Sequence, residues 1–239
     1  MALPTIVFDL DGTLVDSAPD LIATLNTILG REGLPPVGYA AARNMVGGGA
    51  RHMIERGLAA APSPASGLRW GPADVERLCG QFIEHYAAHI ADHSRVFPGV
   101  EAALDELERG GCRLAVCTNK LEGLALRLLG ALGLTQRFAA ICGADTFGVQ
   151  KPDAAILHGT VARAGGHSGA AIMVGDAITD IAVARAAGIA VIAVDFGYSE
   201  TPVAELAPDR VVSSFARLPE VVFALLAAQK GEFSQKVNG

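Results

Sequence analysis

The 239-residue sequence has no apolar run long enough to cross a bilayer, although its mean hydropathy is positive. Apolar stretches such as residues 186–194 and 221–228 are about half of the ~20 residues that a membrane-spanning helix needs. We therefore interpret these stretches as buried strand or helix, and we expect no membrane partner.

Basic residues are also in deficit, with 19 Lys and Arg against 25 Asp and Glu and a net charge of −6. Such a surface repels the phosphate backbones of nucleic acids, so a nucleic-acid partner is not expected. The N-terminus has no basic segment and reaches Asp9 and Asp11 before an apolar segment can form. This pattern is unlike a signal peptide and predicts a cytoplasmic protein.

Paired cysteines are missing too, so the sequence predicts no zinc cluster. The histidines at 85, 89 and 93 have the spacing of one solvated helix face. The four cysteines form no C-x-x-C pair and are interpreted as reduced core thiols, namely Cys79, Cys112, Cys117 and Cys142.

Short apolar runs that alternate with helical patterns dominate most of the chain. This alternation predicts an α/β fold with a doubly wound, Rossmann-like parallel sheet. Continuous apolar runs such as 191–194 are typical of strands that are buried on both faces. The predicted strands are residues 5–8, 113–117, 139–142, 170–174 and 189–194.

Strand patterns vanish between Asp16 and Val96, where the sequence is helical throughout. We therefore predict an α/β core from residues 1–16 and 96–239 and a helical cap from residues 17–95. The predicted cap helices are residues 19–32, 40–60 and 72–90, with linkers at 33–36 and 61–67.

Asp9 and Asp11 directly follow the first predicted strand. Residues two apart on an extended chain point the same way, so both carboxylates are expected at the end of the strand where open α/β sheets hold ligands. Two converging carboxylates repel and need a cation, a shared proton or both. A divalent metal with oxygen ligands fits, and Mg²⁺ is the hard cation suited to phosphate chemistry. The alternative is a turn in which Asp and Gly bond locally.

A second acidic pair, Asp176 and Asp180, follows the apolar run 170–174. Asp180 could stabilise the positive N-terminus of the helix that begins there, a role compatible with support of a metal site. Asp176 precedes that helix and is best explained as a ligand.

Two further motifs are weaker when taken alone. Thr118 and Asn119 end another strand and could hold phosphoryl oxygens without adding charge, although Thr-Asn is also common turn chemistry. Lys151 stands just before a helix that Pro152 marks, a position that a solvated surface lysine could also occupy.

Taken together and in this order, the motifs resemble the haloacid dehalogenase-like hydrolases, specifically their phosphoglycolate phosphatase-like branch. The resemblance covers nearly the whole chain, and the glycine run 47–49 in the cap is similar to that branch. Ala177 and Ala154 depart from the common pattern without removing a catalytic group. The motifs are Asp9-Leu-Asp-Gly-Thr-Leu-Val-Asp-Ser17, Thr118-Asn119, Lys151-Pro152, and Gly175-Asp176 followed by Asp180.

The resemblance implies a phosphatase that uses Mg²⁺ and an aspartyl-phosphate intermediate. Asp9 would be the nucleophile and Asp11 the general acid and base. The metal would be held by the carboxylates of Asp9 and Asp176 and by the backbone carbonyl of Asp11. The remaining implied roles are phosphoryl binding by Thr118 and Asn119, charge neutralisation by Lys151, and support of the metal site by Asp180.

The implied substrate is a small phosphorylated metabolite, with 2-phosphoglycolate as the best single expectation. Its carboxylate would need a cation, for which Arg43 and Arg51 beside the glycine run are candidates, or else they are ordinary helix surface. Sugar phosphates, nucleotides, pyrophosphate, a phosphomutase reaction and a non-catalytic binding module stay open as alternatives. We expect a monomer or a small homo-oligomer.

Overall fold

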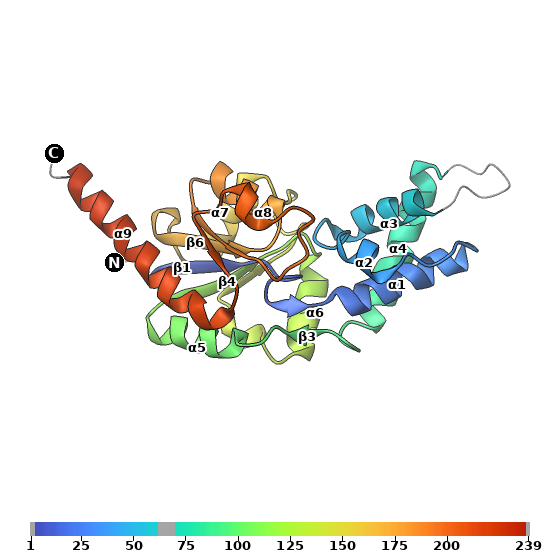
Figure 1. Ribbon diagram of the computed structural model, residues 1–239, viewed down its shortest axis with the longest axis horizontal. Coiled ribbons are helices and arrows are strands. Elements are labelled where there is room, and N and C mark those ends of the chain that lie inside the picture. The colour runs from blue at the N-terminus through green and yellow to red at the C-terminus, as the bar shows by residue number, and fades with distance from the viewer. Residues whose placement is uncertain (1–2, 62–69, 238–239) are drawn as a thin grey trace.

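The computed structural model describes residues 3–61 and 70–237 and has a six-stranded parallel sheet at its centre (Figure 1). The strand order is β5-β4-β1-β6-β7-β8, so β1 lies between β4 and β6. The strands are β1 (Thr5–Phe8), β4 (Arg113–Cys117), β5 (Ala140–Cys142), β6 (Ala171–Gly175), β7 (Ala190–Val194) and β8 (Arg210–Val212).

Helices cover both faces of this sheet, which confirms the predicted doubly wound α/β fold. Ile6 and Phe8 of β1 pack on one face with the helices α5 (Val100–Arg109), α6 (Glu122–Ala131) and α9 (Leu218–Val237). Val7 packs on the opposite face with α7 (Ala154–Arg163) and α8 (Ile178–Ala186). Successive strand residues alternate between the two faces and are buried on both, which explains the continuous apolar runs.

All five predicted strands are present within one or two residues of their expected bounds. The sixth, β8, was missed because it has only three residues at the edge of the sheet, and two of them are exposed. Such a strand lacks the apolar run that made the others visible.

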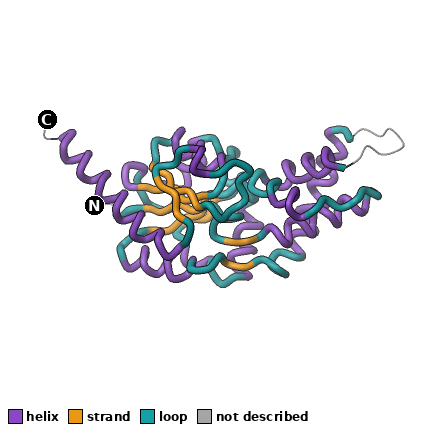
Figure 2. Tube along the Cα trace, viewed as in Figure 1, coloured by secondary structure: helices purple, strands orange, loops and turns teal. Residues whose placement is uncertain are grey.

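The described helices of the predicted cap lie beyond one end of the sheet, away from both chain ends (Figure 2). The short antiparallel strands β2 (Val15–Asp16) and β3 (Arg95–Val96) form the two crossings between cap and core. Between them lie α1 (Ala18–Arg31), α2 (Tyr39–Arg43), α3 (Gly49–Ala60) and α4 (Pro72–Ala88). These helices enclose an apolar cluster that also includes Leu124 and Tyr198 of the core. The predicted linker at 61–67 lies, beyond Ala61, outside the described residues.

One predicted cap helix, residues 40–60, is wrong. The chain instead forms α2 and α3 with a turn between them at residues 44–48. Gly47 and Gly49 have φ of 99° and 83°, values that only glycine adopts at little cost, so this run interrupts the helix. The turn also reaches the core, because a Cβ on Gly49 would lie 3.2 Å from the backbone oxygen of Asn119.

No helix among residues 3–61 and 70–237 combines the length and the apolar character that crossing a membrane requires.

The apolar centre of the cap provides a test of its contribution to stability. Leu25 of α1 is fully buried and packs so closely against α3 that a Cβ on Gly57 would lie 2.9 Å from it. Leu25→Ala is expected to lower the free energy of unfolding by about 2–5 kcal/mol, because it leaves a cavity. Urea denaturation measures the change. The matched control Leu126→Ala, at a side chain that is 38% exposed in α6, should cost about 1 kcal/mol or less.

Candidate active site

Three neighbouring strands end at one edge of the sheet and bring the predicted motifs together. Asp9 follows β1, Thr118 follows β4 and Asp176 follows β6. Because β1 pairs in parallel with both β4 and β6, their carboxyl ends coincide. The backbone N–H of Asp9 extends the pairing by donating to Val174 O at 2.9 Å.

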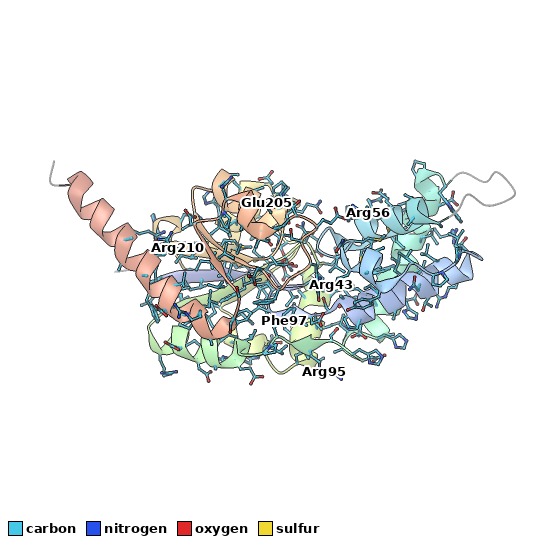
Figure 3. All side chains as sticks on the ribbon, in the orientation of Figure 1. Arg43, Arg56, Arg95, Phe97, Glu205 and Arg210 are labelled. Carbon is cyan, nitrogen blue, oxygen red and sulfur yellow. The ribbon has the colours of Figure 1, made fainter. Side chains whose placement is uncertain are left out.

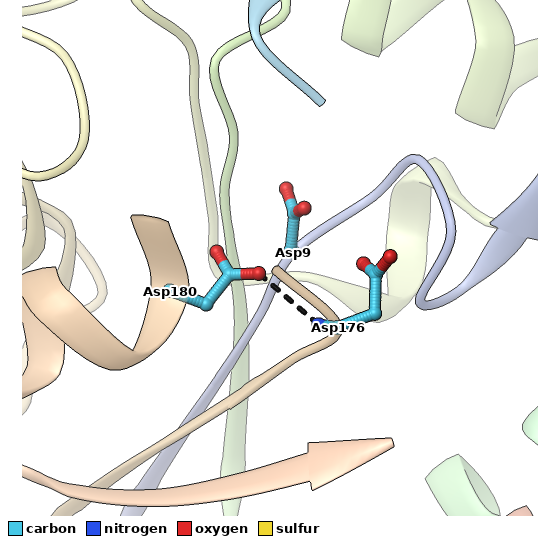
Figure 4. A group of neighbouring side chains, drawn as sticks. All are labelled: Asp9, Asp176 and Asp180. Atoms are coloured by element: carbon cyan, nitrogen blue, oxygen red, sulfur yellow. Dashed lines mark hydrogen bonds between the residues drawn. The ribbon is translucent and has the colours of Figure 1, made fainter. Parts of the chain in front are cut away.

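Asp9, Asp176 and Asp180 form a buried acidic cluster (Figure 4). Each offers a carboxylate oxygen, and these oxygens lie within 4.8 Å of one another. The side chain of Asp180 is engaged within the protein, since its Oδ2 accepts the N–H groups of Asp176 at 3.1 Å and Ala177 at 3.0 Å. Asp180 therefore both stabilises the first turn of α8 and fixes the loop that carries Asp176.

Asp176 is held in a single orientation by two donors. Its Oδ1 accepts from the Thr13 hydroxyl at 2.8 Å and its Oδ2 from the N–H of Tyr198 at 2.7 Å. Gly12 allows this close approach, because it has a φ of 87° and a Cβ there would lie 2.4 Å from Asp176 Oδ2. A residue with a side chain at position 12 would therefore clash with Asp176.

Lys151 places one positive charge inside the acidic cluster. Its Nζ lies 2.8 Å from Asp9 Oδ1 and donates to Asp180 Oδ1 at 2.6 Å. Burial lowers the pKa of Lys151, but the charges of Asp180 and Asp9 outweigh that effect and raise it above its ordinary value. The Lys151 ammonium is therefore charged, and its partners are the carboxylates of Asp9 and Asp180.

One lysine does not neutralise three buried carboxylates. Burial, with the charge of Asp180, raises the pKa of Asp9 to about 7, although Lys151 opposes the shift. Burial and the charges of Asp9 and Asp180 raise the pKa of Asp176 to about 8. The excess negative charge and the oxygen-only donor set fit a hard divalent cation, held by the carboxylates of Asp9 and Asp176.

Asp11 lies beside the cluster but has different partners. Its Oδ1 accepts from the Ser17 hydroxyl, and its Oδ2 lies 2.9 Å from Lys120 Nζ. That ammonium also donates to the hydroxyl of Tyr86, a residue of α4, at 3.2 Å. Lys120 thus connects Asp11, the predicted general acid and base, to Tyr86 of the predicted cap.

Lys120 is a residue that the sequence analysis missed. It is buried and follows Thr118 and Asn119 directly. Its position in a strand-end motif was the available signal, but a lone lysine in a loop is normally solvated.

Thr118 and Asn119 are buried, and both make contacts that shape the site. Thr118 Oγ1 accepts from the backbone N–H of Lys120 at 3.2 Å. Asn119 Oδ1 accepts from the N–H of Lys151 at 2.9 Å, and its Nδ2 donates to Gly47 O at 3.4 Å. Asn119 therefore orients the chain that carries Lys151 and touches the glycine turn of the cap. Phosphoryl binding by these two residues stays a prediction.

Arg43 and Arg51, the two arginines predicted to bind substrate, occupy different places. Arg43 donates to the backbone oxygens of Phe196 at 3.0 Å and Gly197 at 2.6 Å, so it joins the cap to the core, where Figure 3 labels it. Arg51 lines the cavity described below but pairs with Glu55 and Glu76 and is half exposed. The contacts of Arg43 do not favour a substrate role, which stays a prediction for both.

Two cavities open between the core and the cap beside these residues. One, of about 240 Å³, is lined by Asp11, Asn119 and Lys120 from the core and by the glycine turn and Tyr86 from the cap. The other, of about 520 Å³, includes Lys151 and Asp176. Both cavities therefore open beside residues of the candidate site and beneath the predicted cap.

Comparisons with known proteins agree with this arrangement. The sequence pattern of the family described as haloacid dehalogenase-like hydrolase matches residues 6–194. A phosphoglycolate phosphatase of Agrobacterium fabrum is 46% identical over 226 residues, covering 95% of each chain. One of Mesorhizobium japonicum is 48% identical over 218 residues, covering 91% of this chain and 94% of the relative.

Among solved structures, the crystal structure of a predicted phosphoglycolate phosphatase from Haemophilus somnus matches with a TM-score of 0.85 and 30% identity. The match covers 92% of this chain and 97% of that one. The family match over residues 6–194 includes the strands β4 and β6 of the site and β1 from Ile6 onward. The chain therefore belongs to the haloacid dehalogenase-like hydrolases, in their phosphoglycolate phosphatase-like branch.

Proposed function

We propose that this protein is a Mg²⁺-dependent phosphatase that hydrolyses 2-phosphoglycolate through an aspartyl-phosphate on Asp9. The observation that carries the proposal is the position of Asp9, which is buried at the end of β1 beside Lys151 and together with Asp176 and Asp180. The names of the relatives that match most of the chain support the choice of substrate.

In the first step a carboxylate oxygen of Asp9 attacks phosphorus, and the bond from phosphorus to the leaving oxygen breaks. Asp11 gives its proton to the leaving alkoxide, so that glycolate departs as the alcohol. In the second step Asp11 takes a proton from water, whose oxygen attacks phosphorus and displaces the Asp9 carboxylate. Inorganic phosphate leaves, and both aspartates return to their starting states.

The surrounding residues stabilise charge and hold geometry. Lys151 neutralises Asp9 and the phosphoryl oxygens, Thr118 binds the transferring group, and Asp180 keeps Lys151 in place through their 2.6 Å hydrogen bond. Mg²⁺, bound by Asp9, Asp176 and the backbone carbonyl of Asp11, would supply further neutralisation of the phosphoryl charge.

The cap limits both the size of the leaving group and the access of water. The cavity of about 240 Å³ beside Asp11 suits a small leaving group, and closure under the cap excludes bulk water from the acyl-phosphate. A cytoplasmic location and a monomeric or small homo-oligomeric state stay predictions of the sequence.

Phosphate release from 2-phosphoglycolate, compared with sugar phosphates, nucleotides and pyrophosphate, tests the proposal. The highest kcat/KM is expected with 2-phosphoglycolate in the presence of Mg²⁺. A higher value with another ester would keep the mechanism and replace the substrate. Consumption of phosphoester without free phosphate would indicate a phosphomutase, and no turnover at all would indicate a binding module.

Asp9→Asn is expected to lower kcat by at least about a thousandfold, because the amide is a far weaker nucleophile than the carboxylate. Steady-state phosphate release measures the loss, and circular dichroism checks that the fold is kept. Turnover near the wild-type rate would refute Asp9 as the nucleophile.

Asp176→Asn is expected to raise the Mg²⁺ concentration needed for half-maximal activity by about tenfold or more, since a charged ligand becomes neutral. A Mg²⁺ titration of the rate measures the shift. The control is Asp195→Asn, at an exposed carboxylate that follows β7 and lies outside the cluster, and it should leave the requirement unchanged. Chelation of divalent cations should abolish wild-type activity, and activity that survives chelation contradicts the metal requirement.

A further inference from the structure

The cavity beside Asp11 contains a buried cation to which the mechanism above assigns no role. Its described lining includes two acidic side chains, Asp11 and Glu76, and two basic ones, Arg51 and Lys120. Arg51 is half exposed and faces two glutamates. Lys120 differs, because its side chain is only 5% exposed and Asp11 is the carboxylate it pairs with.

Lys120 has more donor capacity than its partners use. An ammonium has three N–H donors. Within the part of the chain that the structure describes, Nζ has two polar side-chain partners, Asp11 Oδ2 at 2.9 Å and the Tyr86 hydroxyl at 3.2 Å. It also lies 4.5 Å from the centroid of the Tyr86 ring, which holds it at the cavity wall. A third donor is left for a ligand inside the cavity.

The other residues of the cavity wall make the charge of Lys120 important for binding an anion. Most of the other lining side chains are apolar, and an anion entering such surroundings loses its hydration without replacement unless a cation meets it. Backbone at the N-terminus of the 12-residue helix α3 lines the same cavity and adds a partial positive charge. The apolar wall consists of Leu21, Met53, Cys79, Phe82, Ile83, Leu121 and Leu124, among others.

The spacing between Lys120 and Asp11 matches one kind of leaving group. Asp11, the proposed acid, must contact the ester oxygen of the substrate. In 2-phosphoglycolate a single methylene separates that oxygen from the carboxylate carbon. The group that protonates the ester and the group that binds the carboxylate must therefore be neighbours, and Asp11 Oδ2 and Lys120 Nζ lie 2.9 Å apart.

We propose that Lys120 selects substrates whose leaving group carries a carboxylate next to the ester carbon, by binding that carboxylate while it holds Asp11 in place. The inference rests on the proposed phosphatase function and deepens it, because it names the residue of this chain that recognises the leaving group. Lys120, and not Arg43 or Arg51, is then the specificity determinant.

Two esters and two variants test the proposal. Ethyl phosphate has the same two-carbon leaving group as 2-phosphoglycolate but lacks the carboxylate. The wild-type kcat/KM is expected to favour 2-phosphoglycolate by roughly 50-fold, and Lys120→Met should bring this ratio close to one. Arg51→Met, which removes the other cation of the same cavity, should keep the ratio.

The ratio of kcat/KM for the two esters shows whether Lys120 recognises the substrate carboxylate or only positions Asp11. If Lys120 only holds Asp11, Lys120→Met lowers kcat/KM for both esters by the same factor, and the specificity role is overturned. A collapse of the ratio in Arg51→Met, with the ratio kept in Lys120→Met, overturns it as well. A wild-type ratio near one overturns this inference and leaves the phosphatase function standing.

An inhibition measurement on the wild-type protein tests the inference even if Lys120→Met folds poorly. Glycolate is expected to inhibit ethyl phosphate hydrolysis competitively, whereas ethylene glycol, its neutral counterpart, should not inhibit at the same concentration. Equal inhibition by the two compounds, or none by either, would overturn the inference. No phosphate release from any ester would overturn the proposed function and this inference with it.

Discussion

The crowding of buried negative charge at one edge of the sheet is the constraint on which the rest of the site depends. Four aspartates are buried there, with two buried lysines beside them: Asp9, Asp11, Asp176 and Asp180 against Lys120 and Lys151. Unpaired charges in a dry interior are costly, so each carboxylate must have a cation or several donors. The two lysines divide the aspartates into two groups, one around Asp9, the proposed nucleophile, and one around Asp11, the proposed acid. The excess charge that remains in the first group is what suits it to a divalent cation and a phosphate ester.

This division of charge also couples the chemistry to the cap. The Asp11 group continues through Lys120 to Tyr86 of α4, so the orientation of Asp11 depends in part on a residue of the predicted cap. The Asp9 group continues through Tyr198, whose N–H donates to Asp176 and whose hydroxyl donates to Asp16, at the first crossing, at 2.6 Å. Both groups therefore have partners outside the sheet edge. Movement of the predicted cap would therefore change the surroundings of Asp11 through Lys120 and Tyr86.

The parts of the fold that follow from local periodicity could be predicted, and the parts that depend on distant contacts could not. Runs such as 171–175 and 190–194 are apolar because both faces of the sheet are covered, so these strands were visible in the sequence. The break between α2 and α3 could not be predicted in this way, because the sequence on both sides has a helical pattern. The helix is interrupted only by the positive φ of the glycines. The role of Arg43 was beyond sequence reasoning as well, since its acceptors lie more than 150 residues away.

By itself, the sequence determined the doubly wound fold and the placement of Asp9, Thr118 and Asp176 at the ends of three strands. These follow from hydrophobic periodicity and from the geometry of parallel strands, whose carboxyl ends share one edge. Only the tertiary structure decided which charges meet. It placed Lys120 rather than an arginine of the cap at the buried wall of the cavity. The physical reason is that burial and the distance between charges determine electrostatic energies, and neither quantity can be predicted from the neighbouring residues in the sequence.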